Sequence, residues 1–242
     1  VVTTLSRGPP ALESALPSAV SCLLDHHSDR SSPPGMGCGR SRYEYDYPDP
    51  YAHWGKPNPV ANFETTMGTI KAEIYMDRVP RTASNFINLC QTGFYNGLHF
   101  HRVIPGFVNQ FGCPVSRDPR AREAGTGNPP DGSFPNLAKN GTLESRFGGG
   151  CIKDENISKD SNKPGSLSMA NTGRPHSGGS QFFMNLTHNT SLDWFSQGAS
   201  KHPVFGQITE GFEIAMEISE VPTTGDNPNT PIMMKSITIS GL

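Results

Sequence analysis

One arginine and one glutamine lie in the largely apolar segment 100–110. If this segment is extended, alternation places Arg102, Ile104, Phe107 and Gln110 near one surface, a pattern that suits a cleft rather than a dry core. Burying a guanidinium in an apolar strand is costly, so this arginine is expected to serve a site. Its planar fork donates several hydrogen bonds in a fixed geometry, and the Gln110 amide is able to brace that fork.

Small, amide and aromatic residues interleave again in three later blocks, at residues 167–173, 178–183 and 202–206. In this order and at this spacing, the blocks and the arginine segment resemble the cyclophilin family of peptidyl-prolyl isomerases. The resemblance covers residues 59–242 and includes residues 80–86, which are similar to the family's first helix. It implies an isomerase without a cofactor or a metal, acting on proline-containing peptides or proteins during folding or on one client.

The implied reaction needs no nucleophile. Rotation about an Xaa-Pro bond faces a barrier of about 18–20 kcal/mol and is slow without catalysis. Because no covalent bond breaks, a site helps by binding the twisted amide, whose prolyl nitrogen has lost conjugation and accepts a hydrogen bond. Arg102 is suited to donate this bond.

The resemblance implies two groups of site residues. The group with catalytic roles consists of Arg102, Phe107, Gln110 and His202. The group expected to bind the peptide consists of Val108, Gly125, Ala170, Asn171, Thr172, Gln181, Phe183, Ser191 and Leu192.

Two of these positions depart from the common family pattern. Val108 stands where many members have Met, which is a conservative change. Ser191 stands where the best-studied members have a Trp that also contacts cyclosporin, so we expect weak binding of this drug. Trp194 either folds back to replace that ring or is a buried packing residue.

Composition and charge argue against several other classes of protein. Apolar residues make up 34% of the 242 residues, and a formal net charge of −2 gives no basic surplus for direct binding of nucleic acid. No apolar run approaches the length of a membrane span. The five cysteines include no Cys-x-x-Cys pair, so a reducing compartment is expected rather than a disulfide framework. This predicts a cytoplasmic protein, or a chloroplast or mitochondrial one if a targeting segment has been removed before Val1.

The chain is expected to divide into an extended or partner-docked tail, residues 1–58, and a domain, residues 59–242. The tail is rich in Pro, Gly and Ser and cannot bury a core of its own. In the domain, many short strands and two isolated helices predict a mostly β fold, a closed eight-stranded antiparallel barrel capped by the helices. A long loop dense in Gly, Pro, Asp and Asn is expected at residues 113–153. Helices are expected from Pro80 up to Gly93 and at 211–219, and strands at 69–74, 98–104, 167–171, 182–186, 204–208 and 232–240.

The sequence leaves three alternatives to the isomerase. No Gly-x-Ser-x-Gly elbow accompanies the Ser, His and Asp residues, so a hydrolase triad is not expected. The tail residues Cys22, His26, His27 and Cys38 are better explained by chance than as metal ligands. The serious alternative is a weakly active or inactive binding or structural subunit of a larger assembly, docked through the tail and its aromatic, acidic run 43–51.

Overall fold

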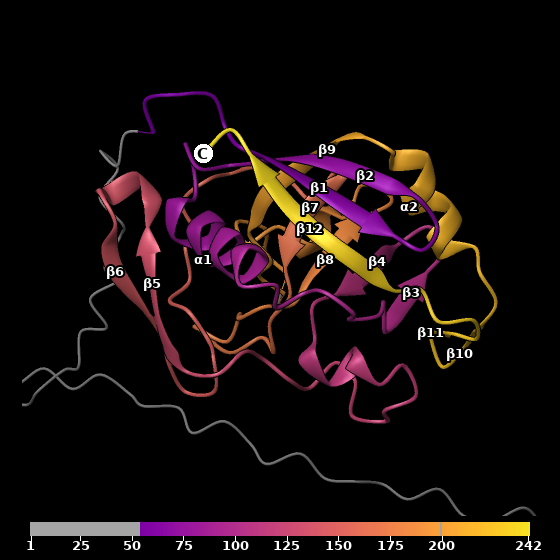
Figure 1. Cartoon of the computed structure of the whole chain (residues 1–242). Helices are drawn as coiled ribbons and strands as arrows, with labels where there is room; N and C mark the ends of the chain where they lie inside the picture. Colours follow the sequence, from indigo (N-terminus) through magenta and orange to yellow (C-terminus); the bar gives the residue numbers. More distant parts are fainter. Residues whose placement is uncertain (1–53, 199) are drawn as a thin grey trace, which may run out of the picture. The chain divides into compact units, whose positions relative to one another are not determined.

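The computed structural model describes residues 54–198 and 200–242, and Figure 1 shows how their strands and helices are arranged. In chain order the α-helices, short 3-10 helices (η) and strands are β1 (Val60–Thr65), β2 (Thr69–Ile74), α1 (Pro80–Gln91), β3 (Arg102–Ile104), β4 (Val108–Phe111), η1 (Pro114–Arg117), β5 (Gly132–Asn136), η2 (Leu137–Lys139), β6 (Thr142–Arg146), β7 (Ser166–Met169), β8 (Phe182–Asn185), η3 (Thr190–Leu192), β9 (Val204–Glu210), α2 (Phe212–Ser219), β10 (Thr223–Thr224), β11 (Asn227–Pro228) and β12 (Met234–Ser240).

Eight strands form one antiparallel sheet in the order β12-β1-β2-β9-β7-β8-β4-β3. Among the described residues its two end strands share no ladder; an isolated bridge joins His99 to Met233 just before β3 and β12. Beside it, the Phe100 N–H donates to the Ile232 carbonyl at 3.0 Å. The predicted eight antiparallel strands and two helices are confirmed. The sheet is a curled half-barrel, however, so the prediction of a closed barrel is too strong. The reason is that only the last part of the predicted strand 98–104 is paired in a ladder.

Alternation along β2 supplies one wall of the core. Ile70, Ala72 and Ile74 are fully buried, whereas the residues between them keep contact with solvent. This is the period of two that a strand with one buried face requires. The sequence therefore places this strand, and through its pairing with β1 and β9 it places the middle of the sheet.

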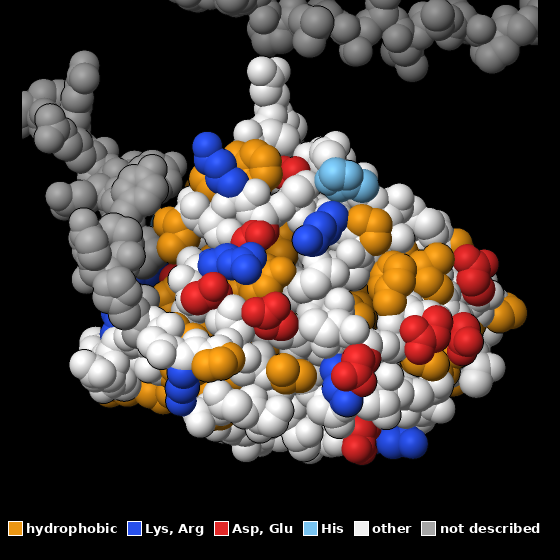
Figure 2. Space-filling model, turned by 90° about the horizontal axis from the view of Figure 1, so that it is seen from above, with side chains coloured by type: hydrophobic (Ala, Val, Ile, Leu, Met, Phe, Trp, Pro, Cys, Tyr) orange, Lys and Arg blue, Asp and Glu red, His pale blue; other side chains and the backbone are white. Residues whose placement is uncertain are grey.

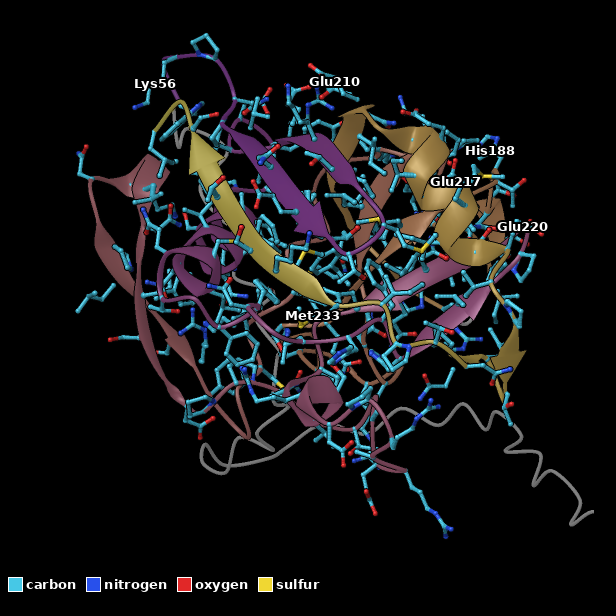
Figure 3. The ribbon with its side chains drawn as sticks, turned by 45° about the vertical axis from the view of Figure 1, so that its right-hand side comes forward. Lys56, His188, Glu210, Glu217, Glu220 and Met233 are labelled. Atoms are coloured by element: carbon cyan, nitrogen blue, oxygen red, sulfur yellow. The ribbon has the colours of Figure 1, made fainter. Side chains whose placement is uncertain are left out.

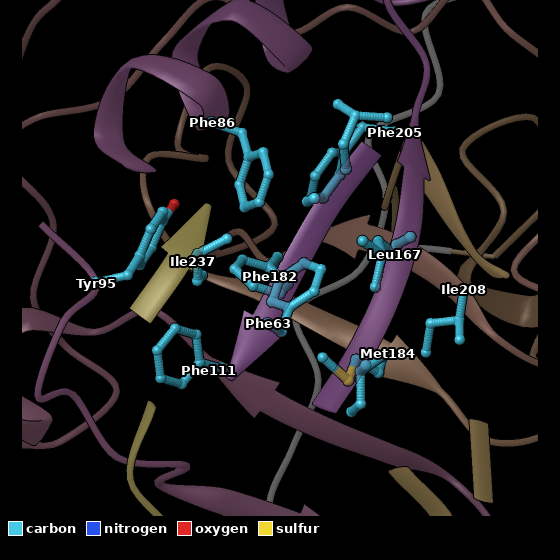
Figure 4. Packing of buried hydrophobic residues seen from close by; sticks show 14 of the residues in the cluster. Phe63, Phe86, Tyr95, Phe111, Leu167, Phe182, Met184, Phe205, Ile208 and Ile237 are labelled. Atoms are coloured by element: carbon cyan, nitrogen blue, oxygen red, sulfur yellow. The ribbon is translucent and has the colours of Figure 1, made fainter. Parts of the chain in front are cut away.

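Aromatic rings fill the space between the sheet and α1 (Figure 4). The Phe182 ring of β8 meets the Phe86 ring of α1 edge-on, with centroids 5.6 Å apart. Phe111 and Phe205 contact the same Phe182 ring, with centroids at 5.6 Å and 5.8 Å. Edge contacts of this kind add about 0.5–1.5 kcal/mol per pair beyond area burial. This cluster fixes β4 and β8, the two strands that carry much of the site.

Helix α1 begins and ends close to where the sequence predicts. Pro80 lies in its first turn, and Ala83, Phe86 and Ile87 are buried on one stripe of the helix. The chain leaves the helix after Gln91, and Gly93 adopts a left-handed φ of +68°. The glycine thus allows the sharp turn that follows the helix.

Helix α2 covers the sheet with Ala215 and Ile218, which are fully buried. Glu217 and Glu220 point outward from this helix, and Glu210 points outward from the end of β9 (Figure 3). Figure 2 shows acidic side chains gathered at one side of this face and Lys and Arg side chains scattered elsewhere on it. This face therefore carries no broad basic patch.

The long loop predicted at residues 113–153 is in part structured. It contains the antiparallel hairpin β5–β6, which is paired from Gly132↔Arg146 to Asn136↔Thr142. Buried polar contacts attach the hairpin to α1: Arg81 Nε lies 2.9 Å from Glu144 Oε2, and Arg146 Nε donates to Asn85 Oδ1 at 2.6 Å. Because charged and amide side chains make these contacts, the hairpin lacks the apolar alternation that predicts a strand.

Most of the predicted tail, residues 1–58, lies outside the described residues, together with its four candidate metal ligands. Its last described part joins the domain, because Asn58 Nδ2 donates to Glu73 Oε1 and Asp77 Oδ1, both at 2.8 Å. In the part of the chain that the structure describes, no helix is long and apolar enough to cross a membrane. The same residues contain no group of three or more His, Cys, Asp or Glu side chains placed to hold a metal ion.

Candidate active site

The β3–β4 hairpin places Arg102 and Gln110 side by side. Arg102 is paired directly with Gln110, and Ile104 with Val108. Arg102, Ile104 and Gln110 are half-buried while Val103 between them is buried, as the predicted alternation requires. The strand connection turns at a glycine with φ +66°, so the hairpin brings Phe107 back toward Arg102.

The Arg102 guanidinium lies between a carboxylate and an aromatic ring. Its Nε is 3.4 Å from Asp226 Oδ2, and its Cζ is 5.9 Å from the centroid of the Phe107 ring. The side chain keeps 40% of its exposure, so the guanidinium is not buried in the core. It is exposed because it alternates with the buried Val103 and so lies on the outer face of β3. The charge therefore stays accessible to a ligand.

Gln110 belongs to a chain of amides. Its Nε2 donates to Gln181 Oε1 at 3.1 Å. Gln181 Nε2 in turn donates to the carbonyls of Gly125 and Gly127 at 2.9 Å and 2.8 Å. The amide nitrogen points along the sheet to Gln181, and among the described residues no hydrogen bond joins Gln110 to Arg102. The chain holds the 125–127 loop against the strand that carries the arginine.

Phe183 and His202 form the neighbouring part of the surface. Phe183 is paired with Gln110 across β4 and β8, and its ring meets the His202 ring edge-on at 5.2 Å. His202 Nδ1 lies 2.9 Å from the Met169 carbonyl. A carbonyl only accepts hydrogen bonds, so Nδ1 carries the proton and Nε2 is left as an acceptor. Burial lowers the pKa of His202, which keeps this ring neutral at physiological pH.

His101 is a second histidine next to the arginine. Its side chain is buried, and its ring lies against the backbone of Gly125. Burial and, to a smaller extent, the nearby Arg102 charge lower the pKa of His101 to about 4. The ring is therefore neutral at physiological pH and adds no second positive charge beside Arg102.

The residues predicted to bind the peptide fall into a connected part and a peripheral part. The Ala170 N–H donates to the Gln181 carbonyl, and the His202 N–H to the Leu192 carbonyl, both at 3.0 Å. Asn171 Nδ2 donates to the Lys201 carbonyl, next to His202. Two further residues of this group are buried among the connected ones: Val108 and Phe183.

Thr172 and Ser191 are the peripheral members, and both are exposed. Ser191 lies in η3, directly before Leu192. The indole N–H of Trp194 donates to the Ser158 carbonyl at 2.6 Å. This bond holds the Trp194 ring against the loop that carries Ser158. The contact favours the packing role for Trp194 over replacement of the Trp ring that is missing at Ser191.

Sequence reasoning missed Asp226. It lies in the turn of the β10–β11 hairpin, and its contact with Arg102 joins segments far apart in the chain. Its only local signal is the Gly225-Asp226 pair, which is typical of a tight turn and says nothing of a partner across the fold.

The curled antiparallel sheet with its two helices is the fold of an isomerase class whose members bind proline-containing peptides. The family model described as cyclophilin type peptidyl-prolyl cis-trans isomerase/CLD matches residues 60–239, and the chain belongs to this family.

Curated relatives agree with the family model. The chain is 37% identical over 177 residues to the Arabidopsis thaliana peptidyl-prolyl cis-trans isomerase CYP18-1, covering 72% of this chain and 92% of that protein. It is 30% identical over 188 residues to the Escherichia coli peptidyl-prolyl cis-trans isomerase B, covering 75% and 99%. A crystal structure of a Cryptosporidium parvum cyclophilin type peptidyl-prolyl cis-trans isomerase has a TM-score of 0.60 at 26% identity, covering 76% of this chain and 99% of that one.

Proposed function

We propose that this cyclophilin accelerates rotation about Xaa-Pro bonds by donating a hydrogen bond from Arg102 to the prolyl nitrogen of the twisted amide. One observation carries the proposal: the guanidinium is half-exposed, is held by Asp226 on its Nε side and lies near the Phe107 ring. The terminal nitrogens of the fork are then the atoms available to a peptide. Since only the twisted amide offers a nitrogen lone pair, the bond favours the transition state over either ground state.

The expected gain is a moderate part of the barrier. Uncatalysed rotation faces about 18–20 kcal/mol. A preorganised donor aimed at charge that develops in a transition state is typically worth about 3–4 kcal/mol, or roughly a hundredfold to a thousandfold in rate. Because the Arg102 charge is partly solvated, we place its effect toward the lower end of this range.

The proline ring would lie on the apolar part of the surface. Val108 and Phe183 are buried, while Phe107 and Leu192 are half-buried and offer apolar area that a ring can cover. Covering such area stabilises the complex by about 25 cal/mol per Å². The backbone at Ala170 and Asn171, the Gln181 amide and the His202 ring would hold the peptide on either side of the proline.

The test is the cis-to-trans rate of a short Xaa-Pro peptide with the wild-type protein, Arg102→Ala and Lys71→Ala. Lys71 is the matched control, since it is a cation of similar exposure, 42%, that is paired with Glu210 on another part of the sheet. We expect Arg102→Ala to lose roughly a hundredfold in kcat/KM while it keeps the wild-type circular dichroism, and Lys71→Ala to keep its activity. A folded Arg102→Ala variant with full activity would refute the assigned role.

A second proposal concerns assembly. The aromatic, acidic run 43–51 of the tail supports docking of the protein, as a subunit, on a larger complex. A pull-down that compares the full chain with residues 54–242 tests this idea, and identical partner sets would contradict it. The shorter version starts before Asn58 so that its bonds to Glu73 and Asp77 are kept.

We further propose a reducing compartment, with the cytoplasm as the first choice and a chloroplast or mitochondrion as the alternative. The free thiols of Cys90 and Cys113, both buried, support this proposal. Fractionation with an antibody against the domain distinguishes the compartments, and recovery from a secreted fraction would contradict it.

A further inference from the structure

Asp226 is attached to the arginine strand through its backbone as well as its side chain. Its carbonyl accepts the Val103 N–H at 2.8 Å, and its Oδ2 lies 3.4 Å from Arg102 Nε. Figure 1 shows the β10–β11 hairpin beside β3, where these contacts are made. One residue thus fixes both the main chain next to Arg102 and the orientation of the Arg102 side chain.

The hairpin that carries Asp226 is itself clamped. Gly225 and Asp226 have φ values of +58° and +64°, as a two-residue type I′ turn requires. Asn227 Nδ2 donates to the Pro119 carbonyl at 3.2 Å, and Arg120 Nη2 donates to the Asn229 carbonyl at 2.6 Å. The carboxylate therefore sits on a fixed support rather than on a free loop.

We propose that Asp226 is a positioning residue for catalysis: its carboxylate holds the Nε edge of Arg102 so that the two terminal nitrogens face the peptide. Among the described residues no hydrogen bond joins Gln110 to Arg102, whereas Asp226 Oδ2 lies 3.4 Å from Arg102 Nε. The side chains of Arg102 and Asp226 are 40% and 49% exposed, so their pairing adds little to stability. The effect lies in the orientation of a side chain that otherwise samples many rotamers. The inference rests on the proposed role of Arg102.

The test uses Asp226→Asn, which keeps the shape and tolerates the left-handed backbone but removes the charge. We expect kcat to fall about tenfold, the factor that corresponds to restored rotamer freedom of an arginine, with KM changed less than about twofold. The matched control is Asp118→Asn, because Asp118 is an exposed aspartate that accepts the Arg120 N–H in the adjoining loop. It should keep the wild-type kcat.

Two further measurements separate positioning from a structural role. In the double variant Arg102→Ala, Asp226→Asn, the second change should cost nothing more, since Asp226 acts only through Arg102. The Arg102 Nε–H signal in a proton–nitrogen spectrum should move in Asp226→Asn and stay in Asp118→Asn. An unchanged kcat in Asp226→Asn, or an equal further loss in the double variant, would overturn the inference. Full activity of Arg102→Ala would instead overturn the proposed function.

Discussion

Glu155 gives the domain a pH-dependent stability that can be worked out from its contacts. This carboxylate is 1% exposed and reaches the start of α1 from a distant loop. Its two oxygens accept the N–H groups of Arg81 and Thr82 at 3.0 Å and 2.8 Å. Val79, the residue directly before α1, makes no capping hydrogen bond with its side chain. Glu155 therefore caps the start of this helix.

Two effects oppose each other at this carboxyl. Burial raises the pKa of Glu155 from 4.5 to about 7, while the bonds from Thr82 and Arg81 and the Arg81 charge act to lower it. A raised carboxyl pKa means that the folded state holds the proton more tightly than the unfolded state does. This contribution to stability is therefore complete below about pH 4.5, falls as the pH rises and is lost above about pH 7. Between about pH 5 and pH 8 the free energy of unfolding should fall by about 2–3 kcal/mol through this group.

The assay is urea unfolding followed by tryptophan fluorescence, for wild type and Glu155→Gln, at several pH values from about 5 to 8. The quantity to follow is the difference in the free energy of unfolding between wild type and Glu155→Gln at each pH. His101 has a lowered pKa and adds stability as the pH rises from about 4, which opposes the Glu155 effect in the wild-type curve. Both proteins contain this histidine, so subtraction removes it.

We expect the stability advantage of wild type over Glu155→Gln to shrink by about 2–3 kcal/mol over this range. Glu220→Gln, which changes an exposed carboxylate directly after α2, is the charge-matched control and should show no such change. A difference that does not vary with pH would refute the reasoning. A difference that grows with pH would show that the two amide bonds and Arg81 outweigh burial and keep Glu155 ionised.

Two further predictions concern packing and the drug. Gly206→Ala should lower the free energy of unfolding by about 1–3 kcal/mol, because a Cβ there would lie 2.6 Å from the Glu73 carbonyl oxygen in the middle of the sheet. Gly132→Ala meets nothing within 4 Å and is the control; equal urea midpoints for the two variants would contradict this packing argument. Cyclosporin should inhibit the wild-type protein weakly, and Ser191→Trp should strengthen inhibition, because Ser191 is exposed in η3 and offers no ring. Tight inhibition of the wild type in a titration of isomerase activity would show that a Trp is not needed.

The sequence predicts those parts of the fold that depend on periodic burial. The alternation of Ile70, Ala72 and Ile74 and the stripe that includes Phe86 on α1 are confirmed, since both follow from one buried face. The β5–β6 hairpin is missed because polar contacts such as Arg81 with Glu144 attach it to α1. A pattern of apolar residues carries no information about such pairs.

The same distinction applies to the site. Strand alternation correctly places Arg102 and Gln110 on one surface, but it does not decide which polar group each one contacts. Across β4 and β8, Gln110 is paired with Phe183, which follows Gln181 by two residues in the chain. Its amide nitrogen donates to Gln181. Arg102 has no strand on its other side and meets the β10–β11 hairpin instead.

Alternation along β3, rather than its place at the end of the sheet, leaves the arginine exposed. Val103 is buried, while Arg102 and Ile104 on either side of it keep contact with solvent. Lys71 shows the same outcome on β2, which has a strand on each side, because its side chain is 42% exposed. The end position of β3 instead leaves room for the β10–β11 hairpin, whose Asp226 contacts one edge of the guanidinium. Alternation therefore determines that the donor is accessible, and the end of the sheet determines which carboxylate it meets.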